Sequence, residues 1–248
     1  MTIKILKKIV GIFGFKLLSK NLIKNERLLS KNDILSTDTI LMNLFDQNKF
    51  NALIQIGSND GLRFDSLNKL IKKYKPKSIL VEPIKEYFDQ LKINYGDYNN
   101  IFFENVAISV NNEINKLYKV DKKFHYKYGE HIKGINSFEI NHLFKHGVKK
   151  NHIIEEEVKS ISIGDLFKKY DFEIELLVID AEGYDASIVT DLLINSNYRP
   201  FIIFEYIHVN HLHLEKLDKL FKEKNYKFFK IEENLICIPS EFNINISV

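Results

Sequence analysis

The chain of 248 residues contains a single cysteine, Cys237, and has only four prolines and ten glycines. One cysteine excludes a disulfide framework and any metal site built from several thiolates. Because Cys237 lies in the apolar run LICIP, we expect a buried structural thiol there and not a nucleophile. Such sparing use of cysteine is typical of a reducing compartment, so we expect a cytoplasmic protein. No linker rich in proline and glycine and no internal repeat divides the chain.

Long apolar runs are also missing. The run KKIVGIFGFK near the N-terminus is closed by Lys16, which leaves it too short for the core of a signal peptide and far short of the roughly 20 apolar residues of a membrane span. Residues 1–31 are instead basic, with eight Lys and Arg against one Glu, a charge of +7 that leaves −4 of the net +3 for the remaining residues. This acidic remainder argues against a nucleic-acid groove.

The basic segment has two interpretations. It could form an amphipathic helix on an anionic membrane surface, which would make the protein peripheral at the inner membrane face. The alternative is a helix packed on the domain, which we favour because Leu17, Leu18 and Leu22 continue its apolar stripe.

From residue 52 the hydrophobic pattern alternates between strands and helices. The predicted strands are 52–57, 78–83, 101–109, 175–183 and 199–206, and the predicted helices are 62–74, 84–95, 184–194 and 212–226. Residues 226–239 form two apolar runs about a turn and predict a C-terminal β-hairpin. Several strands are apolar without interruption, as expected where helices cover both faces of a sheet. The sequence therefore predicts an α/β fold with a doubly wound, mostly parallel sheet of the Rossmann type.

We divide the chain into a helical N-terminal extension, residues 1–50, and one domain, residues 51–248. Within that domain, residues 110–174 interrupt the alternation of strands and helices. This insertion has two further apolar runs, 114–120 and 152–162, which predict extra strands. We expect the insertion to lie on the ligand side of the sheet, where such segments shape a substrate pocket.

The middle of the insertion carries Ser137, His142 and His146 within one short segment. If the segment is helical, the two histidines stand one turn apart on the same face. The segment is then either a lid that contacts the substrate or an ordinary surface helix, and the sequence leaves both interpretations open.

A glycine turn joins the first predicted strand to the first predicted helix in the sequence IQIGSNDGLRF. Its glycines, Gly57 and Gly61, let backbone N–H groups approach a ligand closely, although an ordinary turn would also use them for positive φ. Glu82 closes the next strand, 25 residues after Gly57. A carboxylate in that position can accept hydrogen bonds from both hydroxyls of a ribose. The turn and Glu82 together favour a nucleoside-bearing cofactor.

The chemistry of the turn narrows the choice of cofactor. The turn lacks the G-x-G-x-x-G spacing of dinucleotide enzymes, and Asp60 in its middle would repel a pyrophosphate. An acid there suits a cationic cofactor that carries an amino acid, and S-adenosylmethionine has both a sulfonium and an ammonium group. The sequence contains no Walker loop, G-x-S-x-G elbow, H-E-x-x-H helix or kinase motif, so these enzyme classes are excluded.

Six segments of the chain resemble the FkbM-type methyltransferases in order and spacing: IQIGSNDG, LVEPIKEYFDQL, NVAIS, ISIGDLF, LLVIDAEGYDASIV and PFIIFEYIHV. The resemblance covers residues 50–240, and its most specific element is IDAEGYD. It implies a class I, Rossmann-like fold that uses S-adenosylmethionine, usually to methylate a hydroxyl group of a sugar or another small metabolite. The motifs also imply the cofactor-binding residues, which are Gly57, Asn59, Asp60, Gly61, Glu82, Asn105, Ala107, Asp180 and Glu182.

Methylation of a hydroxyl group requires that the acceptor lose its proton, either to a general base or with the help of a metal ion. Asp180, Glu205 and His208 follow neighbouring strand ends, which face one crevice in a parallel sheet. We expect His208 to act as the base, because an unperturbed imidazole has a pKa of about 6.5. Asp180 would orient the cofactor or the acceptor, and Glu205 is a further candidate base.

Metal binding has two weaker signals in the sequence. The stretch HVNHLH holds His208, His211 and His213, but three histidines on one short loop give poor tetrahedral geometry for zinc. Asp180 and Glu205 could hold Mg²⁺ through oxygen ligands. The segment DAEGYD lacks the spacing of a calcium-binding EF-hand loop. We therefore assign no metal ligands from the sequence.

The leading hypothesis is a methyltransferase that acts on a small-molecule or glycan acceptor and binds no nucleic acid. A nucleotide-sugar or dinucleotide enzyme on the same sheet is disfavoured by the glycine turn. A third possibility is a non-catalytic module that binds a nucleoside cofactor and is anchored through the basic N-terminal helix. The sequence determines neither the acceptor nor the oligomeric state.

Overall fold

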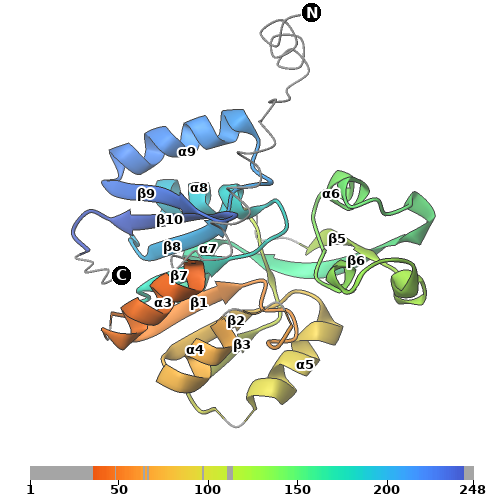
Figure 1. Cartoon of the computed structure of the whole chain (residues 1–248), viewed down its shortest axis with the longest axis horizontal. Helices are drawn as coiled ribbons and strands as arrows, with labels where there is room; N and C mark the ends of the chain where they lie inside the picture. The colour runs from red at the N-terminus through yellow and green to blue at the C-terminus, as the bar shows by residue number, and fades with distance from the viewer. Residues whose placement is uncertain are drawn as a thin grey trace, which may run out of the picture. The chain divides into compact units, whose positions relative to one another are not determined.

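The computed structural model describes one compact unit (Figure 1). The described residues are 36–47, 49–63, 65, 67–96, 98–110 and 114–242. The basic segment 1–31, with its predicted membrane or packing role, lies outside them. Within the described part of the chain, no helix is both long and apolar enough to cross a membrane.

A seven-stranded sheet forms the centre of the unit, in the order β3-β2-β1-β7-β8-β10-β9. Its strands are β1 (Ala52–Ile56), β2 (Lys77–Val81), β3 (Ile101–Glu104), β7 (Leu176–Ile179), β8 (Phe201–Glu205), β9 (Tyr226–Ile231) and β10 (Asn234–Pro239). β10 runs antiparallel to both of its neighbours, whereas β1, β2, β3, β7 and β8 pair in parallel. The predicted α/β fold with a mostly parallel sheet and a C-terminal hairpin is confirmed.

Helices cover both faces of this sheet, as the uninterrupted apolar strands predict. One face carries α3 (Thr37–Asp46), α4 (Leu67–Tyr74) and α5 (Lys85–Tyr95), and the other carries α7 (Ile163–Lys168), α8 (Asp185–Asn195) and α9 (His211–Glu223). Figure 1 shows the two helical layers on either side of the strands. Successive residues of a strand point to opposite faces, so Leu53 belongs to the core under α3 and Ile54 to the core under α8.

Helix α3 belongs to the compact unit, although it precedes residue 51, where the predicted domain begins. Its residues Ile40, Leu41 and Leu44 are fully buried against the sheet. Burying one such side chain contributes about 1.5–3 kcal/mol, so the helix contributes substantially to this layer of the core. The described unit therefore starts at Thr37.

The segment 101–109, predicted as one strand, forms two. β3 ends at Glu104, and β4 (Ala107–Ile108) leaves the large sheet to join a second sheet of three strands. Asn105 lies at the break, and its side-chain amide donates to the backbone oxygens of Glu82 and Pro83 at 2.9 and 3.0 Å. These bonds occupy carbonyl groups just beyond the end of β2, at the point where β3 stops pairing with it.

The insertion builds the second sheet. Its strands are β5 (Ile114–Val120) and β6 (Ile153–Ile161), which pair antiparallel, and β4 pairs in parallel with β6. Both extra strands predicted in the insertion are confirmed. Between them lie α6 (Ile140–Lys145) and three short 3₁₀ helices, η1 (Lys122–Lys127), η2 (Glu130–Lys133) and η3 (Lys150–His152).

Candidate functional site

A cavity of about 650 Å³ opens at the carboxyl ends of the parallel strands. Its volume lies within the range of about 300–1,000 Å³ that is usual for small-molecule sites. β1 and β7 are neighbours in the sheet, although the chain passes through β2 and β3 between them. The cavity therefore lies at the point where the order of the strands reverses, which is where open α/β sheets bind ligands.

The glycine turn closes one wall of the cavity. Gly57 has φ of +81°, and a Cβ atom there would lie 1.9 Å from the backbone oxygen of Asp180. The N–H groups of Gly57 and Ser58 both donate to the backbone oxygen of Val81 at 3.0 Å. The close approach of the β1, β2 and β7 ends therefore requires glycine at position 57, before any ligand is considered.

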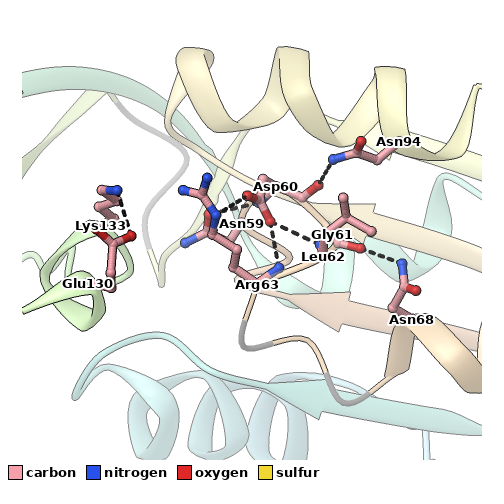
Figure 2. Close-up of polar contacts among 9 residues, drawn as sticks. All are labelled: Asn59, Asp60, Gly61, Leu62, Arg63, Asn68, Asn94, Glu130 and Lys133. Carbon is pink, nitrogen blue, oxygen red and sulfur yellow. Dashed lines mark hydrogen bonds and ion pairs between the residues drawn. The ribbon is translucent and has the colours of Figure 1, made fainter.

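Asp60 lies in the same turn but does not line the cavity. One carboxylate oxygen accepts hydrogen bonds from the N–H groups of Leu62 and Arg63 at 3.0 and 2.8 Å, and the other lies 3.5 Å from Arg63 Nε (Figure 2). Asp60 therefore caps the chain that follows the turn, and Asn59 and Arg63 face the cavity instead. We attributed the preference of the site for a cationic cofactor to Asp60. Because Asp60 does not line the cavity, such a preference has to come from other carboxylates.

Gly61 has a packing role in the structure. A Cβ atom at this position would lie 2.6 Å from side-chain atoms of Leu91 and Tyr95 on α5. The glycine thus allows α5 to pack against the turn. Asn105 is likewise occupied with the end of β2, so neither residue lines the cavity that Gly57, Asn59, Glu82 and Ala107 border.

Glu82 lies at the end of β2 and is almost completely buried. Its two carboxylate oxygens accept hydrogen bonds from the N–H groups of Asn59 and Ile84 at 2.9 and 2.8 Å. Burial raises the pKa of Glu82 to about 7, although these two bonds act in the opposite direction. Each oxygen keeps a free lone pair. Ala107 and Ile108 add an apolar wall beside Glu82, so this side of the cavity fits a ribose and a flat apolar ring.

Three carboxylates line the cavity at the ends of β7 and β8, namely Asp180, Glu182 and Glu205. Burial is the main cause that raises the pKa of each, to about 8 for Glu205. Repulsion by Glu182 further raises the pKa of Asp180. In the described part of the chain no lysine or arginine forms an ion pair with any of the three. Such a wall favours a positively charged ligand, which would replace the missing cationic partners.

The histidines of HVNHLH point in different directions. His208 lines the cavity, with Nε2 at 3.4 Å from Glu205 Oε2. His211 is exposed and faces Glu215, and His213 contacts the hydroxyl group of Thr190 at 3.1 Å. The zinc site considered for this loop is therefore not formed by these three residues. Burial lowers the pKa of His208, so its imidazole is neutral near pH 7 and can accept a proton.

Helix α6 brings two histidines to the same wall. His142 is buried, and its Nε2 lies 2.8 Å from Glu182 Oε2. His146 lines the cavity one turn further on. The Ser137 hydroxyl donates to the backbone oxygen of Glu182 at 2.8 Å, which holds the insertion against the loop after β7. Of the two interpretations of this segment, the structure agrees with contact at the ligand cavity.

Sequence reasoning left His142 and His146 open between a lid that contacts the substrate and a surface helix, and did not place them among the site residues. The available signal was the spacing H-x-x-x-H, which places both imidazoles on one helix face. The spacing alone gave no information on what the face would contact.

Comparison with known proteins gives a family. The family model described as methyltransferase FkbM domain matches residues 55–228. The FkbM methyltransferase of Methylobacillus flagellatus is similar in structure, with a TM-score of 0.47 and 14% identity over 76% of this chain and 43% of that one. The chain thus spans less than half the length of that protein. No curated protein matches this chain significantly.

Two further solved structures are similar over nearly the whole chain. An SAH-bound methyltransferase of Podospora anserina has a TM-score of 0.45 and 8% identity over 96% of this chain and 95% of that one. An O-methyltransferase of Bacillus cereus in complex with SAH has a TM-score of 0.44 and 8% identity over 94% of this chain and 96% of that one.

Proposed function

The chain belongs to the methyltransferase FkbM domain family, and we propose that it uses S-adenosylmethionine to methylate a hydroxyl group of a sugar, a glycan or another small metabolite. One observation supports this proposal above the others. The wall that suits a nucleoside, around Glu82 and Ala107, continues directly into the wall of Asp180, Glu205 and His208 within a single cavity.

The residues of the cavity fit the cofactor in charge and in shape. S-adenosylmethionine, when bound, supplies a methyl group activated by the positive charge of its sulfonium. Glu82 would hold the ribose through its remaining lone pairs, and Ala107 and Ile108 would contact the adenine. Asp180 and Glu182 lack a lysine or arginine partner among the described residues, so a cationic cofactor would supply the opposite charge.

The residues at the end of β8 suit the acceptor. In an in-line methyl transfer much of the catalysis is positioning, and the remaining requirement is a destination for the acceptor proton. His208 and Glu205 lie 3.4 Å apart at the cavity wall, so an acceptor hydroxyl placed there has both an imidazole and a carboxylate within reach. Asp180, between this pair and the glycine turn, would orient the reacting groups.

The proposed reaction is tested by incubating the purified protein with methyl-labelled S-adenosylmethionine and small-molecule and glycan fractions of its host. We expect label in a product whose new methyl group is attached to oxygen, as identified by mass spectrometry and NMR. Label attached to nitrogen or carbon would support the methyltransferase activity but contradict the proposal that the acceptor atom is oxygen. No transfer to any fraction would favour the binding-module alternative.

Replacing Glu82 with Ala should weaken the binding of S-adenosylmethionine and of its demethylated product by about 1–3 kcal/mol, because the ribose loses its partner and two backbone N–H groups lose their acceptor. Titration calorimetry of the wild-type protein should give one site per chain for both ligands and no binding of NAD or ATP. The exposed Glu173→Ala serves as the matched control.

The same titrations should depend on pH. The pKa of Glu82 in the free protein is about 7, and ribose hydroxyls donate hydrogen bonds to its ionised form. Affinity for the demethylated product should therefore fall as the pH is lowered through 7, and Glu82→Ala should reduce this dependence. Unchanged affinity in Glu82→Ala would place the ribose elsewhere.

A further inference from the structure

Four side chains on the acceptor side of the cavity form a cluster that the proposed function does not use as a whole. His142, His146, Glu182 and His208 each present one nitrogen or oxygen atom, and these atoms all lie within 4.8 Å of one another. We propose that this cluster binds one divalent transition-metal ion of the zinc type, and that the ion lies at the acceptor end of the cavity.

The cluster joins three parts of the fold. His142 lies within α6 of the insertion and His146 directly follows that helix. Glu182 lies in the loop after β7, and His208 lies in the loop after β8. The ring centroid of His142 lies 4.6 Å from that of His208 and 4.8 Å from that of His146. Two histidines four residues apart at one helical turn supply a pair of metal ligands in many zinc sites.

The backbone around Glu182 is fixed in a conformation that presents its carboxylate to the histidines. Glu182 has φ of +47° and Gly183 has φ of +96°, both in the left-handed region. The buried Asp185 carboxylate accepts hydrogen bonds from the N–H groups of Ala181 and Gly183 at 3.3 and 3.2 Å. Ser137 binds the Glu182 backbone oxygen from the other side. A positive φ at a non-glycine residue costs free energy, and it persists here because these contacts hold it.

The electrostatics of the cluster also suit a cation. The 2.8 Å contact between His142 Nε2 and Glu182 Oε2 needs a hydrogen on one of the two atoms, and a metal ion bound to both would displace it. The ion would also offset the negative charge of a wall that carries Asp180, Glu182 and Glu205. Glu205, at 3.4 Å from His208 Nε2, places a carboxylate beside one of the imidazoles, an arrangement common around metal-bound histidines.

The donor set selects the class of metal. Three imidazoles and one carboxylate suit Zn²⁺ and the neighbouring ions Co²⁺, Ni²⁺ and Fe²⁺, whereas Mg²⁺ and Ca²⁺ prefer sites built from oxygen alone. The Mg²⁺ site considered from the sequence, on Asp180 and Glu205, lacks such nitrogen donors. The two sites therefore differ in the metal that they would select.

The position of the cluster gives the ion a function, which rests on the proposed methyl transfer. His146, Glu182 and His208 line the cavity, while His142 lies buried behind them. Zinc can accept an additional ligand beyond four. An acceptor hydroxyl bound to the ion would transfer its proton to Glu205, and the ion would stabilise the resulting oxygen anion. As this oxygen forms its bond to the methyl carbon, the bond from that carbon to the sulfonium sulfur breaks, and the demethylated cofactor leaves as a neutral thioether. The ion would also join α6 of the insertion to the ends of β7 and β8.

The metal site is tested without cofactor or acceptor, on the full-length protein with any affinity tag removed and after treatment with a chelator. We expect one equivalent of Zn²⁺ per chain by titration and mass spectrometry. Co²⁺ should give the intense visible absorption of a four- or five-coordinate site with nitrogen ligands. A large excess of Mg²⁺ should compete with neither ion.

Variants locate the site. His146→Ala should weaken Zn²⁺ and Co²⁺ binding by at least about tenfold. Loss of a residue that only supports a metal ligand already has an effect of this size, and His146 is itself a proposed ligand. His146 is only partly buried, so this variant should fold, and circular dichroism checks it beside His142→Ala, whose side chain is buried. His211→Ala, exposed and outside the cluster, is the matched control and should bind metal like the wild type.

Two results would overturn the proposal. One is the absence of stoichiometric Zn²⁺ or Co²⁺ binding to the folded wild-type protein. The other is binding that His142→Ala and His146→Ala leave unchanged, which would place the ion elsewhere. Neither measurement involves methyl transfer. The proposed metal site can therefore be contradicted while the proposed methyltransferase activity is kept, and the reverse is also possible.

Discussion

Replacing His208 with Ala is expected to lower methyl-transfer turnover by roughly 10²-fold or more, which is the usual size of a contribution from acid–base or metal-assisted activation of an acceptor. His208 lies at the cavity wall beside Glu205, on the acceptor side. Affinity for the demethylated cofactor should remain within a few-fold of the wild-type value. Steady-state turnover and calorimetry measure the two quantities separately.

The adjacent histidines provide the control for this variant. His211→Ala removes an exposed imidazole at the start of α9, three residues after His208, and should retain wild-type turnover. Full activity in His208→Ala would remove this residue from both the base and the metal-ligand roles. If the variant is inactive, added Zn²⁺ distinguishes the two roles, because excess metal can refill a weakened metal site but cannot replace a lost base.

Replacing Asp180 with Asn is expected to abolish most of the turnover, again by about 10²-fold or more, in a protein that still binds the demethylated cofactor. The substitution keeps the shape of the side chain and removes its charge. Asp180 lines the cavity directly after β7, where its backbone N–H donates to the backbone oxygen of Ile56 at 3.0 Å and its backbone oxygen lies against Gly57. Its carboxylate therefore borders the glycine turn on one side and Glu182 on the other.

The measurement pairs single-turnover rates with binding of the demethylated cofactor, which lacks the positive sulfonium. If Asp180 acts on developing charge, the rate should fall while this affinity stays nearly constant. An equal loss in both would show that Asp180 shapes the binding site as a whole. Glu173→Ala, which changes an exposed acid just before β7, is the control for a general effect of charge.

The amino-acid sequence alone determined the sheet and the family. Uninterrupted apolar runs such as 176–179 and 201–204 are stable in water only where both of their faces are covered, and that property is local to each run. The glycines at 57 and 61 were recognisable for the same reason, since positive φ and close contact are requirements of a single position. The resemblance of IDAEGYD and its companion segments to the FkbM methyltransferases was confirmed over residues 55–228.

Local sequence patterns gave wrong predictions where a polar side chain hydrogen-bonds to backbone groups that the pattern does not identify. The run 101–109 is apolar enough for one strand, yet the Asn105 amide binds the end of β2 and β4 joins a different sheet. Asp60 reads as an acid facing the ligand, but its carboxylate caps the N–H groups of the next turn. In both cases the partner is a backbone group, and only the folded structure shows which backbone groups lie within reach of the side chain.

The acceptor side of the site was decided by tertiary structure. His142 and Glu182 are 40 residues apart in sequence and become neighbours because β5 and β6 carry α6 to the ends of β7 and β8. The spacing of His142 and His146 fixes their common face, since helical geometry repeats every turn. Which groups that face meets depends on pairing between distant strands, and no short-range pattern contains that information.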